Sequence, residues 1–280
     1  MSRLRFSFLI KFLVCIGCVL ACTDFANPSK VKEKTTKDIA EALCPELLRL
    51  GLRKVHVTDF VDVNGKSSGV GQFVAASLAR DLRARCAGVA DRVQMGKILA
   101  GHHWSSGDLA NPRIAAQLAS ETGIDGTISG VVSAGDVPQN FRVSLIVRDA
   151  AYKQLLQERF DQSVTAPIFG ILAATRNDDL GSHPNFAGLD GISAPMCKSC
   201  PNPEYSKSAF ARKIQGNVSV YVLVSEQGDL TNPHIVESIS DLDGNAIKAL
   251  KSWKLTPGKN SDGTAVPTWV AIEIAFRFRP

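Results

Sequence analysis

Two cysteines in this 280-residue sequence have the spacing of a redox-active or metal-binding pair. Cys197 and Cys200 form a Cys-Lys-Ser-Cys motif, a spacing seen in redox-active pairs and in half of a zinc site. The motif stands beside Pro201, has no second Cys-x-x-Cys, and does not join a strand to a helix. We therefore interpret it as a structural disulfide rather than a redox or metal site.

Two further motifs fit ordinary local structure better than a ligand site. Gly65-Lys66-Ser67 lacks the glycine that a phosphate-binding loop needs five positions earlier, because Phe60 stands there. His102 and His103 are adjacent, so on a helix their side chains point about 100° apart and make a poor metal site. The sequence therefore predicts no catalytic residue, no metal site, no cofactor and no enzymatic activity.

Positive charge is concentrated at the N-terminus of the chain. The formal net charge is +5, and Arg3, Arg5 and Lys11 contribute three of these charges with no acid among them. Without them the balance is about +2, so we expect no nucleic-acid partner. The apolar run from Phe12 to Ala21 follows and is too short to cross a bilayer comfortably. Positive charges followed by such a run are typical of a secretory signal.

Residues 1–22 are thus predicted to be a signal peptide with a candidate lipobox. Val19-Leu20-Ala21-Cys22 resembles the bacterial lipobox, so Cys22 is the predicted lipidation site of a lipoprotein. Ordinary cleavage after Ala21 and retention of Phe6 to Ala21 as an anchor are the alternatives. All three place the rest of the chain outside the cytoplasm, and a lipid or anchor makes it a periplasmic, membrane-anchored protein of the bacterial cell envelope.

Thiols outside the cytoplasm tend to be oxidised, so the remaining cysteines are disulfide candidates. They are Cys44, Cys86, Cys197 and Cys200, which allow three pairings. The local pairing of Cys197 with Cys200 leaves Cys44 and Cys86 for each other.

The first half of the chain alternates between helix and strand patterns. Residues 23–38 are polar and lysine-rich and are predicted to be a flexible tether. Residues 39–165 are predicted to be an α/β domain with a mixed sheet, and Asn111 and Pro112 have the types expected where one of its helices begins. Its expected helices span 39–50, 70–82 and 112–122, and its expected strands 55–61, 127–133, 141–148 and 155–164.

Core positions in this half carry a resemblance. Val57-Thr58-Asp59-Phe60 precedes a glycine-bearing loop and a helix, and Ile124-Asp125-Gly126 precedes a strand. This order resembles the periplasmic domain of CsgG and FlgO, envelope lipoproteins associated with curli or flagellar assembly, over roughly residues 36–165. No long amphipathic hairpin is evident, so we expect no secretion pore. Residues 166–200, rich in Pro and Gly, are predicted to be a linker.

The last 80 residues follow a strand, turn, helix and strand order. Valines alternate along Asn217 to Ser225, and a second strand at His234 to Ile239 is expected to pair with it as a hairpin. Trp253 shares a helical stripe with Leu242, Ala246 and Leu250 and is expected to anchor the core; Asp241 is the expected helix cap. Thr268 to Phe278 alternates again. The result is an α+β unit: an antiparallel sheet covered by a helix.

Residues 201–280 closely resemble the C-terminal domain of TonB-family proteins. The matching positions are Tyr205, Ala211-Arg212, Gly216, the valine-rich strand, Gly228, Ala246, Trp253 to Pro257, Gly263, Val266-Pro267 and Phe276. A TonB energy transducer proper also has a long uncleaved N-terminal helix and a long Pro-rich spacer. Neither is obvious here, so the resemblance implies a TonB-type domain more strongly than energy transduction.

In the TonB family the edge of the last strand captures a short extended peptide. The resemblance therefore implies a non-enzymatic envelope binding or adaptor protein whose protein partner, an outer-membrane protein among the candidates, adds a strand there. The partner-contacting residues would be Trp269, Ala271, Glu273, Arg277 and Arg279. The alternatives are a TonB-type energy transducer serving transmembrane transport at an outer-membrane transporter, and a periplasmic thiol oxidoreductase that uses Cys197 and Cys200. The sequence predicts no oligomeric state.

Overall fold

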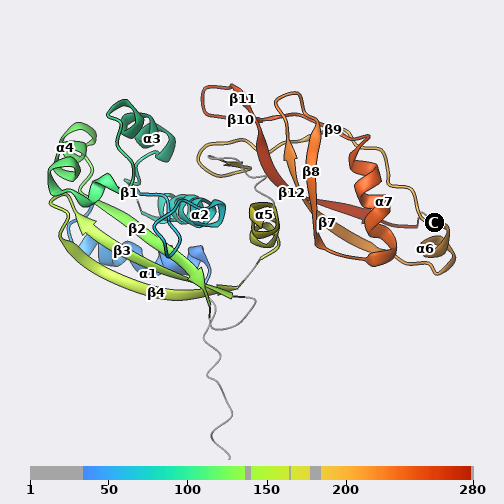
Figure 1. Cartoon of the computed structure of the whole chain (residues 1–280), viewed down its shortest axis with the longest axis horizontal. Helices are drawn as coiled ribbons and strands as arrows, with labels where there is room; N and C mark the ends of the chain where they lie inside the picture. The colour runs from blue at the N-terminus through green and yellow to red at the C-terminus, as the bar shows by residue number, and fades with distance from the viewer. Residues whose placement is uncertain (1–33, 87, 136–139, 164, 177–183, 279–280) are drawn as a thin grey trace, which may run out of the picture. The chain divides into compact units, whose positions relative to one another are not determined.

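The computed structural model describes residues 34–280 except for 87, 136–139, 164, 177–183 and 279–280. Within these residues the fold is α+β, as predicted, and contains two four-stranded sheets (Figure 1). One sheet has the strand order β1-β2-β3-β4 and the other β5-β12-β7-β8. The strands of the first sheet lie within residues 55–163 and those of the second within residues 185–276.

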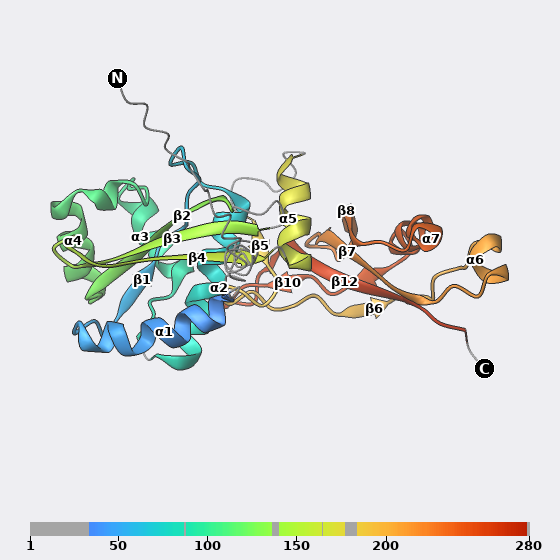
Figure 2. The same cartoon turned by 90° about the horizontal axis from the view of Figure 1, so that it is seen from below.

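The first sheet is mixed, as expected. Its strands are β1 (Val55–Val57), β2 (Gly126–Ala134), β3 (Asn140–Asp149) and β4 (Gln154–Ser163). β1 pairs with β2 in parallel, and the other neighbours are antiparallel. Val143, Leu145 and Val147 are fully buried because alternate side chains of β3 point into the core. The core continues into α1 (Thr36–Arg49) and α2 (Gly69–Arg85), which pack on each other (Figure 2).

Helix caps explain where these helices begin. α1 starts inside the stretch predicted as tether, because Thr35 and Asp38 form a capping box. At α4 (Pro112–Thr122) the side chain of Asn111 accepts a hydrogen bond from the Arg113 amide, and Gly123 ends the helix with a φ of 67°. α4, η1 (Asp108–Ala110) and α3 (Arg92–Gly101) enclose a smaller core of their own.

A disulfide links the first two helices. Cys44 of α1 is joined to Cys86 at the end of α2, with a Cα–Cα distance of 5.7 Å. Cys197 is joined to Cys200, with a Cα–Cα distance of 6.0 Å. Both distances lie in the usual range for disulfides, and the pairing is the one that the sequence indicates.

Segment 166–200 is more ordered than the linker prediction implied. It contains α5 (Ala166–Arg176), β5 (Asn185–Phe186) and β6 (Cys197–Ser199). α5 packs on β7, β8 and β12, and β5 pairs with β12 in parallel. A close approach makes this packing possible, because a Cβ at Gly170 would lie 2.3 Å from the Cβ of Tyr221. The segment therefore contributes a helix and a short strand to the C-terminal sheet.

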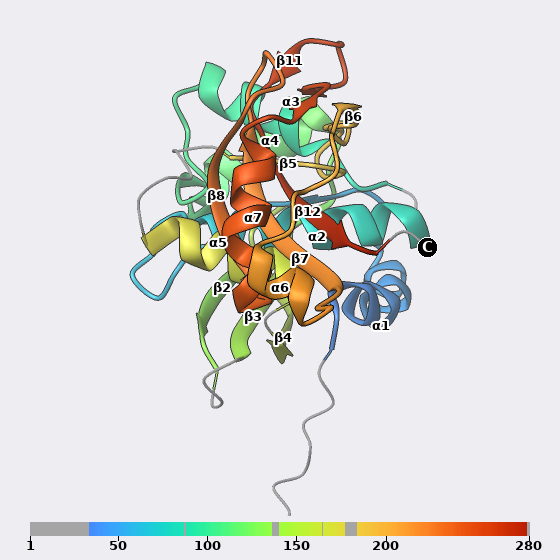
Figure 3. The ribbon, with the colours of Figure 1, turned by 90° about the vertical axis from the view of Figure 1, so that its right-hand side faces the viewer.

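The C-terminal sheet contains the predicted hairpin. β7 (Gly216–Val224) pairs with β8 (Leu230–Glu237) on one side and with β12 (Thr268–Phe276) on the other. α7 (Ser240–Leu250) covers the valine face of β7, while α5 lies on the opposite face (Figures 1 and 3). The shorter elements are α6 (Lys207–Ala211), β9 (Lys254–Leu255), β10 (Gly258–Lys259) and β11 (Ala265–Val266).

Two details of α7 differ from expectation. Its N-cap is Ile239 rather than Asp241, and the Asp243 carboxylate accepts the Ile239 amide instead. The helix ends at Leu250, so Trp253 lies beyond it, only half-buried, and donates its indole N–H to the Pro201 carbonyl at 2.9 Å. The most buried tryptophan of the sheet is Trp269, which is 2% exposed.

Candidate functional site

Strand β12 has a backbone edge that is mostly unpaired. β5 covers this edge only opposite Thr268 and Trp269, where the Trp269 carbonyl accepts the Ala187 amide at 3.0 Å. Peptide groups of alternate residues in a strand point to the same side. Ala271, Glu273 and Ala275 therefore direct their N–H and C=O groups to the same edge as Trp269. No strand among the described residues pairs with the edge there.

Two opposite charges lie on either side of Ala275: Glu273 on β12 and Arg277 directly after the strand. Ala271, Glu273 and Arg277 are all exposed. The Asn217 side chain bridges the charged pair: its Nδ2 donates to Glu273 Oε2 at 3.1 Å, and its Oδ1 accepts from Arg277 Nη2 at 3.2 Å. The structure thus brings together three of the residues proposed from sequence to contact a partner. The alternation of side chains predicted that these residues share one face of the sheet, but nothing in the sequence identified Asn217 as the residue that bridges them.

Trp269 was expected to contact a partner, and the structure shows that this expectation is wrong. Its side chain lies on the same side of the sheet as Glu273, as the alternation predicts, but it is 2% exposed. Its ring stacks on Tyr221 with centroids 5.1 Å apart and an interplanar angle of 8°. α5 covers this end of the face, so Trp269 cannot contact a peptide here. Arg279 and Cys22 lie outside the described residues.

A cavity of about 430 Å³ lies where the edge ends. Its lining residues come from the segment before α6 and from the end of β12: Asn202, Pro203, Tyr205, Ala275, Phe276 and Arg277. Tyr205 packs edge-on against Phe276 at 5.5 Å and stacks on Phe278 at 4.8 Å. The cavity therefore has an aromatic wall, and Arg277 is among its lining residues.

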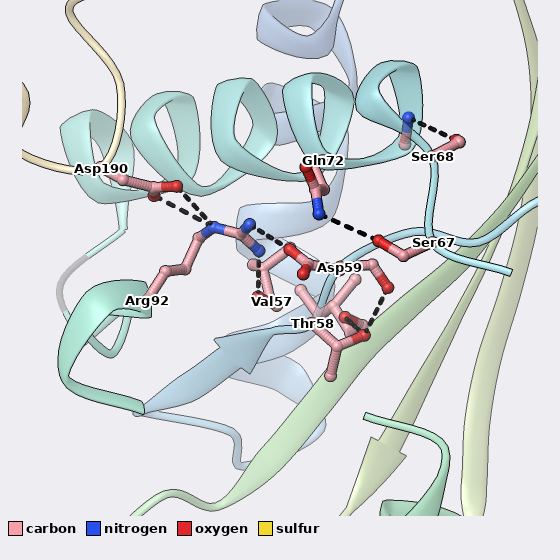
Figure 4. A network of polar contacts seen from close by, with 10 residues as sticks. Val57, Thr58, Asp59, Ser67, Ser68, Gln72, Arg92 and Asp190 are labelled. Carbon is pink, nitrogen blue, oxygen red and sulfur yellow. Dashed lines mark hydrogen bonds and ion pairs between the residues drawn. The ribbon is translucent and has the colours of Figure 1, made fainter. Parts of the chain in front are cut away.

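A second cluster of charged residues surrounds Arg92 on α3 (Figure 4). The Arg92 side chain is 8% exposed and donates to Asp59 at 2.5 Å, to both carboxylate oxygens of Asp190 at 3.0 and 3.2 Å, and to the Val57 carbonyl at 2.7 Å. A cavity of about 270 Å³ lies beside it. Because the guanidinium already has these partners, we interpret Arg92 as structural. Sequence reasoning missed it because its partners are 33 and 98 residues away.

His56 of β1 is buried close to this cluster. Loss of hydration on burial, and then the positive charge of Arg92, lower the pKa of His56 to about 3. The imidazole is therefore neutral at neutral pH, and its Nδ1 has no hydrogen-bond partner among the described residues. A general acid or base works best with a pKa near the operating pH, so His56 is poorly suited to that role.

The described residues hold no group of three His, Cys, Asp or Glu side chains placed to bind a metal ion. None of their helices is both long enough and apolar enough to cross a membrane. The Cys197–Cys200 disulfide is on the surface of the C-terminal part, where β6 pairs with β9.

Several solved structures are similar to parts of this chain. The LpoB C-terminal domain from Salmonella enterica has 13% identity and a TM-score of 0.36, covering 46% of this chain and 96% of that one. Lipoprotein GNA1162 from Neisseria meningitidis has 16% identity and a TM-score of 0.34, covering 46% and 98%. The Pseudomonas aeruginosa TonB C-terminal domain has 23% identity and a TM-score of 0.25, covering 35% and 100%. At such TM-scores these likenesses support no inference about function.

Family comparison gives a firmer result for the end of the chain. Comparison with curated proteins found no match. The family model for the C-terminal region of the Gram-negative bacterial TonB protein matches residues 201–278. The match does not include residues 36–165, whose resemblance to CsgG and FlgO stays a prediction. Residues 201–278 of this chain are a TonB C-terminal domain.

Proposed function

We propose that this protein is a non-enzymatic binding or adaptor protein of the bacterial cell envelope, which contacts a protein partner by strand addition at β12. The observation that carries the proposal is the unpaired edge at Ala271, Glu273 and Ala275. A partner segment in extended conformation would satisfy these peptide groups, and its side chains would add selectivity. The family match at residues 201–278 supports this use of the edge.

Exposed edge strands also need protection against unwanted pairing. A charged side chain such as Glu273 on an edge strand reduces aggregation, so its presence alone does not require a partner. An edge that only has to avoid aggregation does not need a cavity such as the one lined by Tyr205 and Phe276. An edge with a cavity at its end is better suited to receive a specific peptide than to repel every strand.

Strand addition at this edge can be blocked with one substitution. Ala271→Pro removes the N–H that points to the free edge, whereas the peptide groups of Val270 and Ile272 keep their pairing with β7. We expect the variant to lose most of the partner captured by the wild-type protein from solubilised native membranes. Quantitative mass spectrometry of the captured proteins measures the loss.

Ala271→Ser is the matched control, because it changes the side chain but keeps the edge N–H. Circular dichroism must show that both variants keep the wild-type spectrum and melting transition. If a folded Ala271→Pro variant captures the same proteins in the same amounts as Ala271→Ser, the proposal of strand addition at this edge is wrong.

Membrane attachment through the N-terminus is the second part of the proposal. The lipobox-like Val19 to Cys22 segment supports lipidation of Cys22, and several acyl chains at about 0.8 kcal/mol per buried CH₂ would hold the protein stably. We expect metabolic labelling with a fatty-acid analogue to label the wild-type protein and not Cys22→Ser. Equal labelling of both would contradict lipidation at Cys22. An intact mass that retains residues 1–21 would instead favour an uncleaved anchor, as in an energy transducer.

A further inference from the structure

We infer that the β12 edge selects its peptide by charge: it prefers an antiparallel strand with an acidic residue beside Arg277, an apolar residue beside Phe276, and a basic residue beside Glu273. The inference rests on the proposed function, since it concerns the same edge. It adds the chemical class of the partner segment and its register.

The positions of the two charges carry the argument. Glu273 is on β12, and Arg277 directly follows Phe276, the last residue of this strand. Both side chains are hydrogen-bonded to the side chain of Asn217, so they lie on the same face of the sheet. Residues directly opposite each other on neighbouring strands have Cβ atoms about 5 Å apart, close enough for opposite charges to attract. Asn217 of β7 contacts both side chains, which holds the two charges in place on this face of the sheet. An added strand therefore meets a fixed pair of unlike charges.

The cavity specifies the residue between the charges. Phe276 faces the side of the sheet opposite Glu273 and Arg277, and it is fully buried beside Tyr205. A peptide residue paired with Phe276 places its side chain on that same side, next to Tyr205 and Pro203 of the cavity lining. Aromatic and proline walls favour an apolar side chain there.

β5 limits how far a peptide can slide along the edge. It occupies the edge opposite Thr268 and Trp269, so an added strand can pair only from Ala271 onward. A shift of one residue would put charged peptide side chains on the cavity side and apolar ones beside Glu273. We choose the antiparallel direction because antiparallel pairing is slightly more stable per residue.

Two synthetic peptides of equal composition test the rule. The first, Asp-Leu-Thr-Val-Lys-Val-Thr with blocked ends and a fluorescent label, pairs its residues in turn with Arg277 back to Ala271. The second exchanges its Asp and Lys. Fluorescence anisotropy with the full-length protein should show a Kd roughly tenfold lower for the first peptide, since two exposed cross-strand pairs change from attraction to repulsion. The preference should shrink at high salt.

The double variant Glu273→Lys/Arg277→Glu is the matched control, because it exchanges the two charges and leaves the edge peptide groups unchanged. We expect it to reverse the preference. Equal affinities for the two peptides, a wild-type preference for the second, or no binding of either would each overturn the charge rule. The proposed function is judged separately by Ala271→Pro: capture that depends on the Ala271 N–H would stand even if the charge rule fails.

Discussion

Replacing Trp269 with alanine is expected to lower the free energy of unfolding by about 3–5 kcal/mol, the usual cost of truncating a fully buried aromatic residue. The side chain is 2% exposed and stacks on Tyr221. It also lies in the core to which Ile168 and Ile171 of α5 contribute. Truncation would therefore leave a cavity at the junction of β12, β7 and α5, in addition to the loss of buried apolar area.

Trp253→Ala is the matched comparison, since it removes the same side chain from a half-buried position. Its indole keeps one hydrogen bond, to the Pro201 carbonyl, so we expect a loss of about 1–2 kcal/mol. Urea denaturation of both variants, followed by circular dichroism so that loss of an indole does not alter the signal, measures the two values. An equal or larger loss for Trp253→Ala would contradict the assignment of Trp269 as the anchor of this sheet.

The contrast between these tryptophans shows what alternation along a strand can and cannot predict. The pattern of β12 correctly placed Trp269, Ala271 and Glu273 on one face. It could not show that the face is covered by α5 at one end and open at the other. That difference depends on a helix from the segment predicted as linker, and helix formation alone does not reveal which surface a helix will cover.

Long periodic elements were predictable, whereas very short ones were not. The nine-residue strands β7 and β12 and the capped helix α4 follow from apolar periodicity and from Asn111, Pro112 and Gly123. β5 has two residues, too few to show any period, yet it decides where the open edge of β12 begins. The cluster around Arg92 was equally hidden, because ion pairs between distant residues leave no spacing in the sequence.

Acid is expected to destabilise the wild-type protein partly through His56. Its pKa is about 3 in the folded protein and near 6.5 when exposed, so between these values the unfolded state binds the proton and the folded state does not. The stability from the neutral, buried imidazole is therefore complete above pH 6.5 and is lost as the pH falls toward 3. At pH 4.5, which is two units below the pKa of the unfolded state, the stability lost from this source corresponds to about 3 kcal/mol.

His56→Leu isolates this contribution from that of the carboxylates, which titrate in both proteins. Leucine fills most of the same buried space and has no proton to gain. We expect the difference in unfolding free energy between the variant and the wild type, measured in urea at several pH values, to shift by about 3 kcal/mol in favour of the variant between pH 7 and pH 4.5. A difference that stays constant across this range would mean that His56 takes up a proton without unfolding, and that its burial beside Arg92 does not oppose the charge.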